Sequence, residues 1–105
     1  MGAEVFYNTA KGRSSIEAFK YAVEEALYEH GHGGYSGTIA EKNSFIVITH
    51  VDNEAEAYKL AEKLIDEDDN RVNDKWGDAG CIKFGERTGD YDDPENYLFF
   101  GLASS

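Results

Sequence analysis

The stretch FIVITHVDNEAEAYKLAEKLI, residues 45–65, decides the expected fold because it joins a strand to a helix. The apolar run 45–48 is rich in β-branched residues and does not alternate with polar ones, which predicts a strand that is covered on both faces and central in its sheet. Asn53 precedes Glu56 by three residues, the spacing of a helix N-cap, and apolar residues then recur at helical intervals up to Ile65. The stretch therefore predicts a central strand followed by an amphipathic helix.

Towards the N-terminus, the same reasoning predicts a strand, a helix and a second strand. Residues 4–9 contain a β-branched and aromatic run that is broken by Gly12. Ser14 and Glu17 have the spacing of a capping box, and the helical pattern that follows ends at Gly31. Residues 35–40 read as a strand that forms a hairpin with 45–51 through a polar turn at 41–44.

Towards the C-terminus, two more strands are expected at 79–86 and 97–103, after a polar connection that contains Trp76. The element order is then βαββαββ. This order resembles a ferredoxin-like variant of the α+β class, with a mostly antiparallel sheet and two helices on one of its faces. Without a linker or an internal repeat, residues 1–105 are expected to form a single α+β domain.

The charge of the chain bears on its partners. The formal net charge is −11, and residues 51–105 carry 15 acidic and 6 basic side chains. Such a surface repels phosphates, which argues against direct nucleic-acid binding and favours a basic protein partner. Solubility alone, or adaptation to salt, would also account for the charge. The single cysteine and the absence of a membrane-length apolar window in the sequence predict a cytoplasmic protein without a membrane anchor.

Acidic residues interleaved with aromatic ones form the leading candidate site. Carboxylates imitate phosphate charge and attract a basic partner, while tyrosine and tryptophan supply anchoring area. A solvated acidic surface with its aromatic residues turned inward is the ordinary alternative. The candidate partner-binding residues are Asp66, Glu67, Asp68, Asp69, Asp74, Trp76, Asp78, Asp90, Tyr91, Asp92, Asp93 and Glu95.

The glycine-rich segment 30–37 is the alternative site. His30 and His32 are candidate acid–base groups, and Gly33, Gly34 and Tyr35 are candidate ligand-binding residues beside them. The segment lacks the third glycine of a dinucleotide fingerprint and follows a helix instead of opening one. Its ordinary interpretation is a helix stop and a sharp turn.

No cofactor or metal is predicted. The spacing of His30, His32, His50 and Cys81 matches no zinc pattern, and Cys81 reads as a small core residue more readily than as a nucleophile. The acidic run that begins at Asp66 fails the EF-hand pattern, because arginine and glycine stand where glycine and glutamate are required. The acids of 90–95 have the composition of a loose cation site, with solvated loop acids as the alternative.

Three strings stand out along the chain: HGHGGYSGTIAEK at residues 30–42, DKWGDAGCI at 74–82 and YLFFGLASS at 97–105. They resemble a small family of uncharacterised bacterial and phage proteins that has no assigned activity, so the resemblance implies no catalytic residues. It implies a phage-encoded accessory role.

Taken with the charge, this predicts an acidic non-enzymatic interaction protein: an inhibitor or nucleic-acid mimic that acts on a host defence or nucleic-acid-processing complex. The alternatives are a small ligand-binding or hydrolytic domain that uses the 30–37 loop, and an oligomerising domain that pairs a sheet edge with itself.

Overall fold

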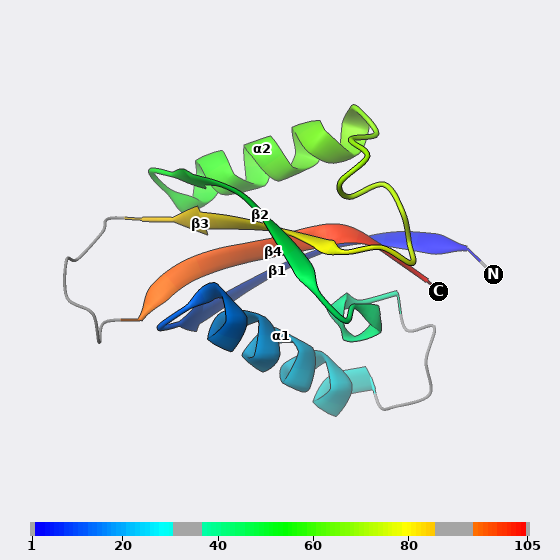
Figure 1. Ribbon diagram of the computed structural model, residues 1–105, viewed down its shortest axis with the longest axis horizontal. Helices are drawn as coiled ribbons and strands as arrows, with labels where there is room; N and C mark the ends of the chain where they lie inside the picture. The colour runs from blue at the N-terminus through cyan, green and yellow to red at the C-terminus, as the bar shows by residue number, and fades with distance from the viewer. Residues whose placement is uncertain (1, 31–36, 86–93, 105) are drawn as a thin grey trace.

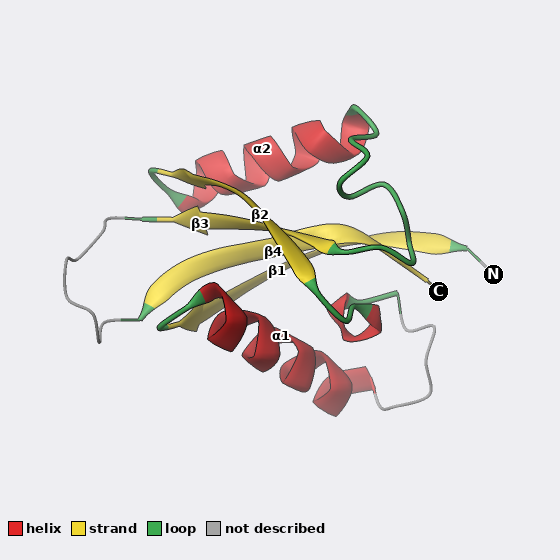
Figure 2. Cartoon of the chain, viewed as in Figure 1, coloured by secondary structure: helices red, strands yellow, loops and turns green. Residues whose placement is uncertain are grey.

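The computed structural model describes residues 2–30, 37–85 and 94–104, which form a four-stranded sheet and two α-helices. Figure 2 shows the helices in red and the strands in yellow. They are β1 (Ala3–Gly12), α1 (Ser15–His30), the short 3-10 helix η1 (Ile39–Glu41), β2 (Phe45–Val51), α2 (Glu54–Asp66), β3 (Ala79–Phe84) and β4 (Glu95–Ser104). The predicted α+β class is confirmed.

The sheet has the strand order β1-β4-β3-β2, so the last strand of the chain lies in its interior. β4 is antiparallel to β1 along ten residue pairs, from Ala3↔Ser104 to Gly12↔Glu95, and antiparallel to β3 on its other side. β2 pairs with β3 in the parallel direction. The sheet is therefore mixed, and the expected antiparallel character holds for two of its three pairings.

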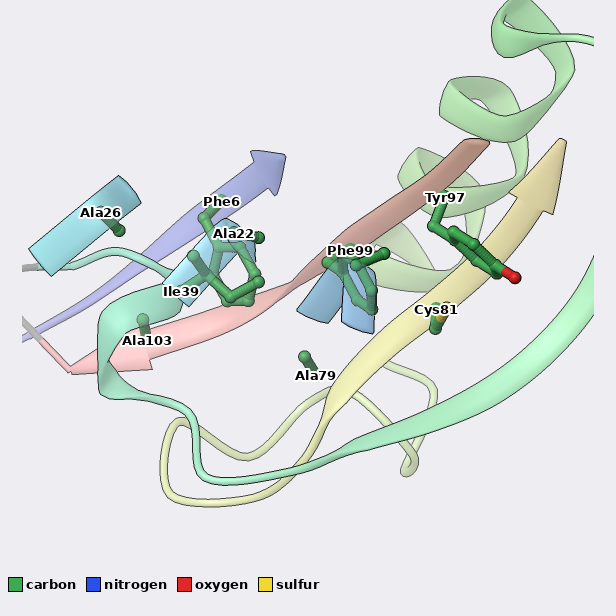
Figure 3. Packing of buried hydrophobic residues seen from close by; sticks show 10 residues of the cluster. Phe6, Ala22, Ala26, Ile39, Ala79, Cys81, Tyr97, Phe99 and Ala103 are labelled. Carbon is green, nitrogen blue, oxygen red and sulfur yellow. The ribbon is translucent and has the colours of Figure 1, made fainter. Parts of the chain in front are cut away.

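The two helices cover opposite faces of the sheet (Figure 1). Side chains on a strand alternate between faces, and in β4 Phe99 packs with α1 while Phe100 packs with α2. Figure 3 shows the α1 side, where Phe99 lies among Phe6, Ile39 and Cys81. The prediction that both helices lie on one face is wrong, because each face of β4 is apolar and each must be covered.

The predicted strand at 35–40 is wrong within its described part. Gly37 and Thr38 form a bend, and η1 follows, capped by the Thr38 hydroxyl, which accepts a hydrogen bond from the amide of Ala40 at 3.2 Å. Within the described residues 37–44, no strand pairs with β2 as a hairpin, and β2 lies at an edge of the sheet and not at its centre. Val47 in β2 is accordingly 58% exposed.

The predicted helix starts are confirmed by their caps. Ser14 Oγ accepts from the amide of Glu17 at 3.1 Å, and Asn53 Oδ1 accepts from the amide of Glu56 at 2.9 Å. Gly12 allows β1 and α1 to approach closely, since a Cβ atom there would lie 2.6 Å from the backbone nitrogen of Ala18. The expected helix stop at Gly31 lies outside the described residues.

Candidate partner-binding surface

The structure brings two of the predicted acidic segments together where α2 ends and the chain turns towards β3. Asp66, Glu67 and Asp68 end the helix, and the Asn73 side-chain amide donates to the Asp68 carbonyl at 3.2 Å, which holds the following segment against that end. We call this surface the acidic end. It comprises Asp66, Glu67, Asp68, Asp74, Trp76 and Asp78, all of which are exposed.

A buried lysine shapes the acidic end. Lys42 is only 3% exposed, and its ammonium group donates to the carbonyls of Asp74 at 3.2 Å, Lys75 at 3.3 Å and Gly77 at 2.9 Å. Burial lowers its pKa from the ordinary value, and the charges of Asp74 and Asp78 act in the opposite direction. Lys42 thus holds the turn 74–77 through its backbone carbonyls. The place of Lys42 in a polar segment of the sequence does not indicate this role.

The turn is also closed by its own side chains. Asp74 Oδ1 accepts from the amide of Trp76 at 2.9 Å, and the Asp74 carbonyl accepts from the amide of Gly77 at 2.9 Å. The Ser44 hydroxyl donates to Asp78, which ties the end of the turn to the residue before β2. The turn is thereby preorganised before any partner arrives.

Trp76 lies on this turn with 66% of its surface exposed. The Lys75 ammonium lies 5.4 Å from the centroid of the indole ring, within the range of a cation–π contact. Large aromatic side chains are normally mostly buried, so an exposed tryptophan on a fixed turn is the kind of feature that marks an interaction surface. The ordinary alternative, in which the aromatic residues of this surface turn inward, does not hold for Trp76.

The acids at the end of α2 differ in how far their charge is compensated. Asp68 adopts a left-handed conformation with φ 56° as the helix ends, and its side chain is exposed. Asp69 accepts hydrogen bonds from the side chain and the backbone of Arg71, which lower the pKa of its carboxyl group to about 2. The negative charge of Asp69 is therefore partly balanced by Arg71.

The other predicted partner-binding residues do not join the acidic end. Glu95 begins β4 and forms an ion pair with Lys83 near the end of β3, whereas the acidic end precedes the start of that strand. Tyr97 beside it is buried in the α1 cluster, as the inward-facing alternative expected. Asp90, Tyr91, Asp92 and Asp93 lie outside the described residues, as does the candidate cation loop that they form.

The alternative catalytic and metal residues are dispersed or outside the described ranges. His30 is the last residue of α1, and His32, Gly33, Gly34 and Tyr35 are not described. His50 Nε2 lies 2.9 Å from the Gly85 carbonyl oxygen. Cys81 is fully buried, as expected of a core residue, and burial raises the pKa of its thiol to about 12, which disfavours the thiolate that nucleophilic attack requires. Among the described residues, no three histidine, cysteine or acidic side chains are grouped as a metal site.

Comparison with known proteins leaves the function open: no protein family, curated protein or solved structure matches the chain. Within the described ranges, neither helix combines the length and apolar character that a membrane crossing requires. The interpretation of the surface therefore rests on its geometry and charge.

Proposed function

We propose that the chain is a non-enzymatic interaction protein that binds a basic partner through the acidic end. The observation that carries this proposal is Trp76, exposed on a turn that Lys42 and Asp74 hold in one conformation, with carboxylates on both sides of it. Tryptophan is the most frequent kind of binding hot spot, and a preorganised turn loses little conformational entropy when it binds. The surrounding charge attracts a basic groove over a distance and selects against acidic partners.

The proposed partner is a nucleic-acid-binding or nucleic-acid-processing complex. Proteins of this class carry grooves of lysine and arginine that bind phosphates, and the carboxylates of Glu67, Asp68 and Asp78 present comparable negative charge. By occupying such a groove, the chain inhibits the complex as a nucleic-acid mimic. The resemblance to bacterial and phage proteins makes a host defence complex the expected target.

The test is affinity capture from a bacterial lysate at low and moderate salt, followed by titration of the purified captured protein. Trp76→Ala should weaken the complex by at least about 30-fold, the effect of a strong hot spot, and Glu67→Gln with Asp68→Asn should make binding less dependent on salt. The matched controls lie on α1: Tyr28→Ala, at a residue 92% exposed, and Glu24→Gln with Glu25→Gln.

Two results bear on the nucleic-acid mimic specifically. Duplex DNA should displace the chain from the captured protein, because both occupy the same basic groove. Binding that responds no more to the changes at Trp76, Glu67 and Asp68 than to the α1 controls would show that the acidic end is not the contact surface.

A further inference from the structure

β1 offers an open backbone edge of unusual regularity. Its pairing with β4 runs through ten consecutive residue pairs without a break, and no strand within the described residues lies on its other side. Along that outer side, N–H and C=O groups point outward in alternation, which makes an edge strand a template for another strand. The opposite edge, β2, has an irregular register between Val47 and Thr49, and such bulges hinder strand addition.

A row of residues on α2, the helix that packs over β3 and β4, faces towards β1 on one face of the sheet. Its members are four positions apart and so share one side of the helix: they are Glu54, Tyr58, Glu62 and Asp66. The row meets β1 near one end of the strand and at its middle.

Glu54 lines a hollow of about 340 Å³ together with Thr9 and Lys11, near the end of β1. In the middle, the ring of Tyr58 lies 5.9 Å from that of Tyr7. Beyond it, Glu62 and Asp66 add their negative charge to the effect of burial, and together these raise the pKa of Tyr7. Glu62 and Asp66 stand one and two turns beyond Tyr58 on the same side of α2, so their carboxylates lie on the side of the helix that faces Tyr7.

We infer that β1 accepts an extended segment of the partner as a fifth strand of the sheet, with lysine or arginine side chains directed towards Glu62 and Asp66. This inference rests on the proposed function, because it names the part of the basic partner that is recognised. The spacing of side chains on the added strand matches the spacing of the carboxylates on α2. Alternate side chains of a strand are about 6.8 Å apart, and residues four apart on a helix are separated by about 6 Å along its axis. Backbone hydrogen bonds provide the affinity, and the carboxylates select basic side chains.

Charge decides between a basic segment and a second copy of this chain. Each copy carries a net charge of −11, and pairing β1 with β1 of another copy would bring two such charges together, with Glu62 and Asp66 of each near the joint. A lysine-bearing strand instead neutralises these carboxylates. The edge is therefore suited to a basic partner and disfavours self-association.

The probe is a fluorescein-labelled ten-residue peptide of alternating lysine and threonine, titrated with the whole chain and followed by fluorescence polarisation. Two further peptides of equal charge carry N-methyl groups either on all lysine amides or on all threonine amides. Because alternate amides of a strand point to opposite edges, each methylated peptide can donate from only one edge. One of them should therefore bind at least tenfold more weakly than the parent peptide, and the other should bind nearly as well.

Variants of the protein locate the peptide. Glu62→Gln with Asp66→Asn should weaken binding by about tenfold, the upper effect of two exposed ion pairs, whereas Glu24→Gln with Glu25→Gln, an equal change in charge on α1, should have little effect. Amide hydrogen exchange in β1 should slow when the peptide binds, since the outward N–H groups gain acceptors.

Equal affinity of all three peptides would show attraction by charge alone and would overturn the inference, as would equal weakening of both methylated peptides or no binding at all. Loss of peptide binding in Trp76→Ala, with no effect of Glu62→Gln alone, would place the peptide on the acidic end, to which Asp66 also belongs. That result would refute strand addition and leave the proposed function standing. If the peptide still binds β1 while Trp76→Ala leaves binding of the captured partner unchanged, the proposed function fails and strand addition stands.

Discussion

Replacing Lys42 with methionine tests whether one buried ammonium group holds the acidic end in shape. Methionine keeps an unbranched, apolar side chain in the space of the lysine stem and removes the three hydrogen bonds to the carbonyls of Asp74, Lys75 and Gly77. These carbonyls must then be rehydrated by opening of the turn or stay without a donor.

The expected loss follows from the strength of these bonds. A hydrogen bond from a charged donor contributes about 1.5–3 kcal/mol, and three are removed. In the native protein, the stabilisation from these three hydrogen bonds is partly offset by the cost of burying the ammonium group. That group is nearly inaccessible to solvent, and burial lowers its pKa. We expect the free energy of unfolding to fall by about 2–4 kcal/mol, which is a large part of the stability of a domain of this size.

The assay combines urea unfolding, followed by far-ultraviolet circular dichroism, with the fluorescence anisotropy of Trp76, the only tryptophan. The unfolding midpoint should fall by about 1–2 M, and the anisotropy in the absence of urea should fall as the turn loosens. Lys59→Met, at an exposed position on α2, is the control and should alter stability by less than about 0.5 kcal/mol. If Lys42→Met matches this control in both measurements, the turn does not depend on Lys42 and the preorganisation argument fails.

Two further predictions concern the core. The free energy of unfolding should decline as the pH rises above 9, because the pKa of the Cys81 thiol is 9.0 in the unfolded chain and about 12 in the folded protein, so the unfolded state loses its proton first. Cys81→Ala should remove up to about 4 kcal/mol of this decline by pH 12, measured by urea unfolding along a pH series. An unchanged dependence of stability on pH would contradict the burial argument. Gly12→Ala should lower the free energy of unfolding by about 1–3 kcal/mol, since the added Cβ atom meets the Ala18 backbone nitrogen at 2.6 Å, and thermal unfolding at the parent midpoint would show that α1 shifts freely.

Local signals in the sequence predicted the elements, and long-range contacts decided how they are arranged. Ser14 and Asn53 mark their helices because a cap involves residues only three apart. The apolar run at 45–48 suggested a central strand, yet the interior strands are β4 and β3. In β4, Phe99 faces α1 while Phe100 faces α2. Both runs are continuously apolar, so the pairing of strands decides which of them is central.

The candidate site was predictable in its charges and not in its architecture. The acids of the α2 terminus and the aromatic side chain of Trp76 are visible in the sequence as a cluster. The part played by Lys42 is not, because the carbonyls that it binds belong to residues 32 to 35 positions away, and backbone carbonyls leave no trace in residue identity. The row on α2 was not predictable for a related reason: it bears on β1 only because the fold packs Tyr58 against Tyr7.

The place of β4 in the sheet has a consequence for synthesis on the ribosome. β1 and β3 both pair with β4, which follows them in the chain, and among the described strands the one pairing that does not involve β4 is that of β2 with β3. β1 therefore emerges first and waits through nearly the whole translation of this chain before its hydrogen-bonding partner is made. Such distant pairing slows folding and leaves apolar strands temporarily exposed, so the nascent chain is expected to need chaperone protection until residues 95–104 have left the exit tunnel.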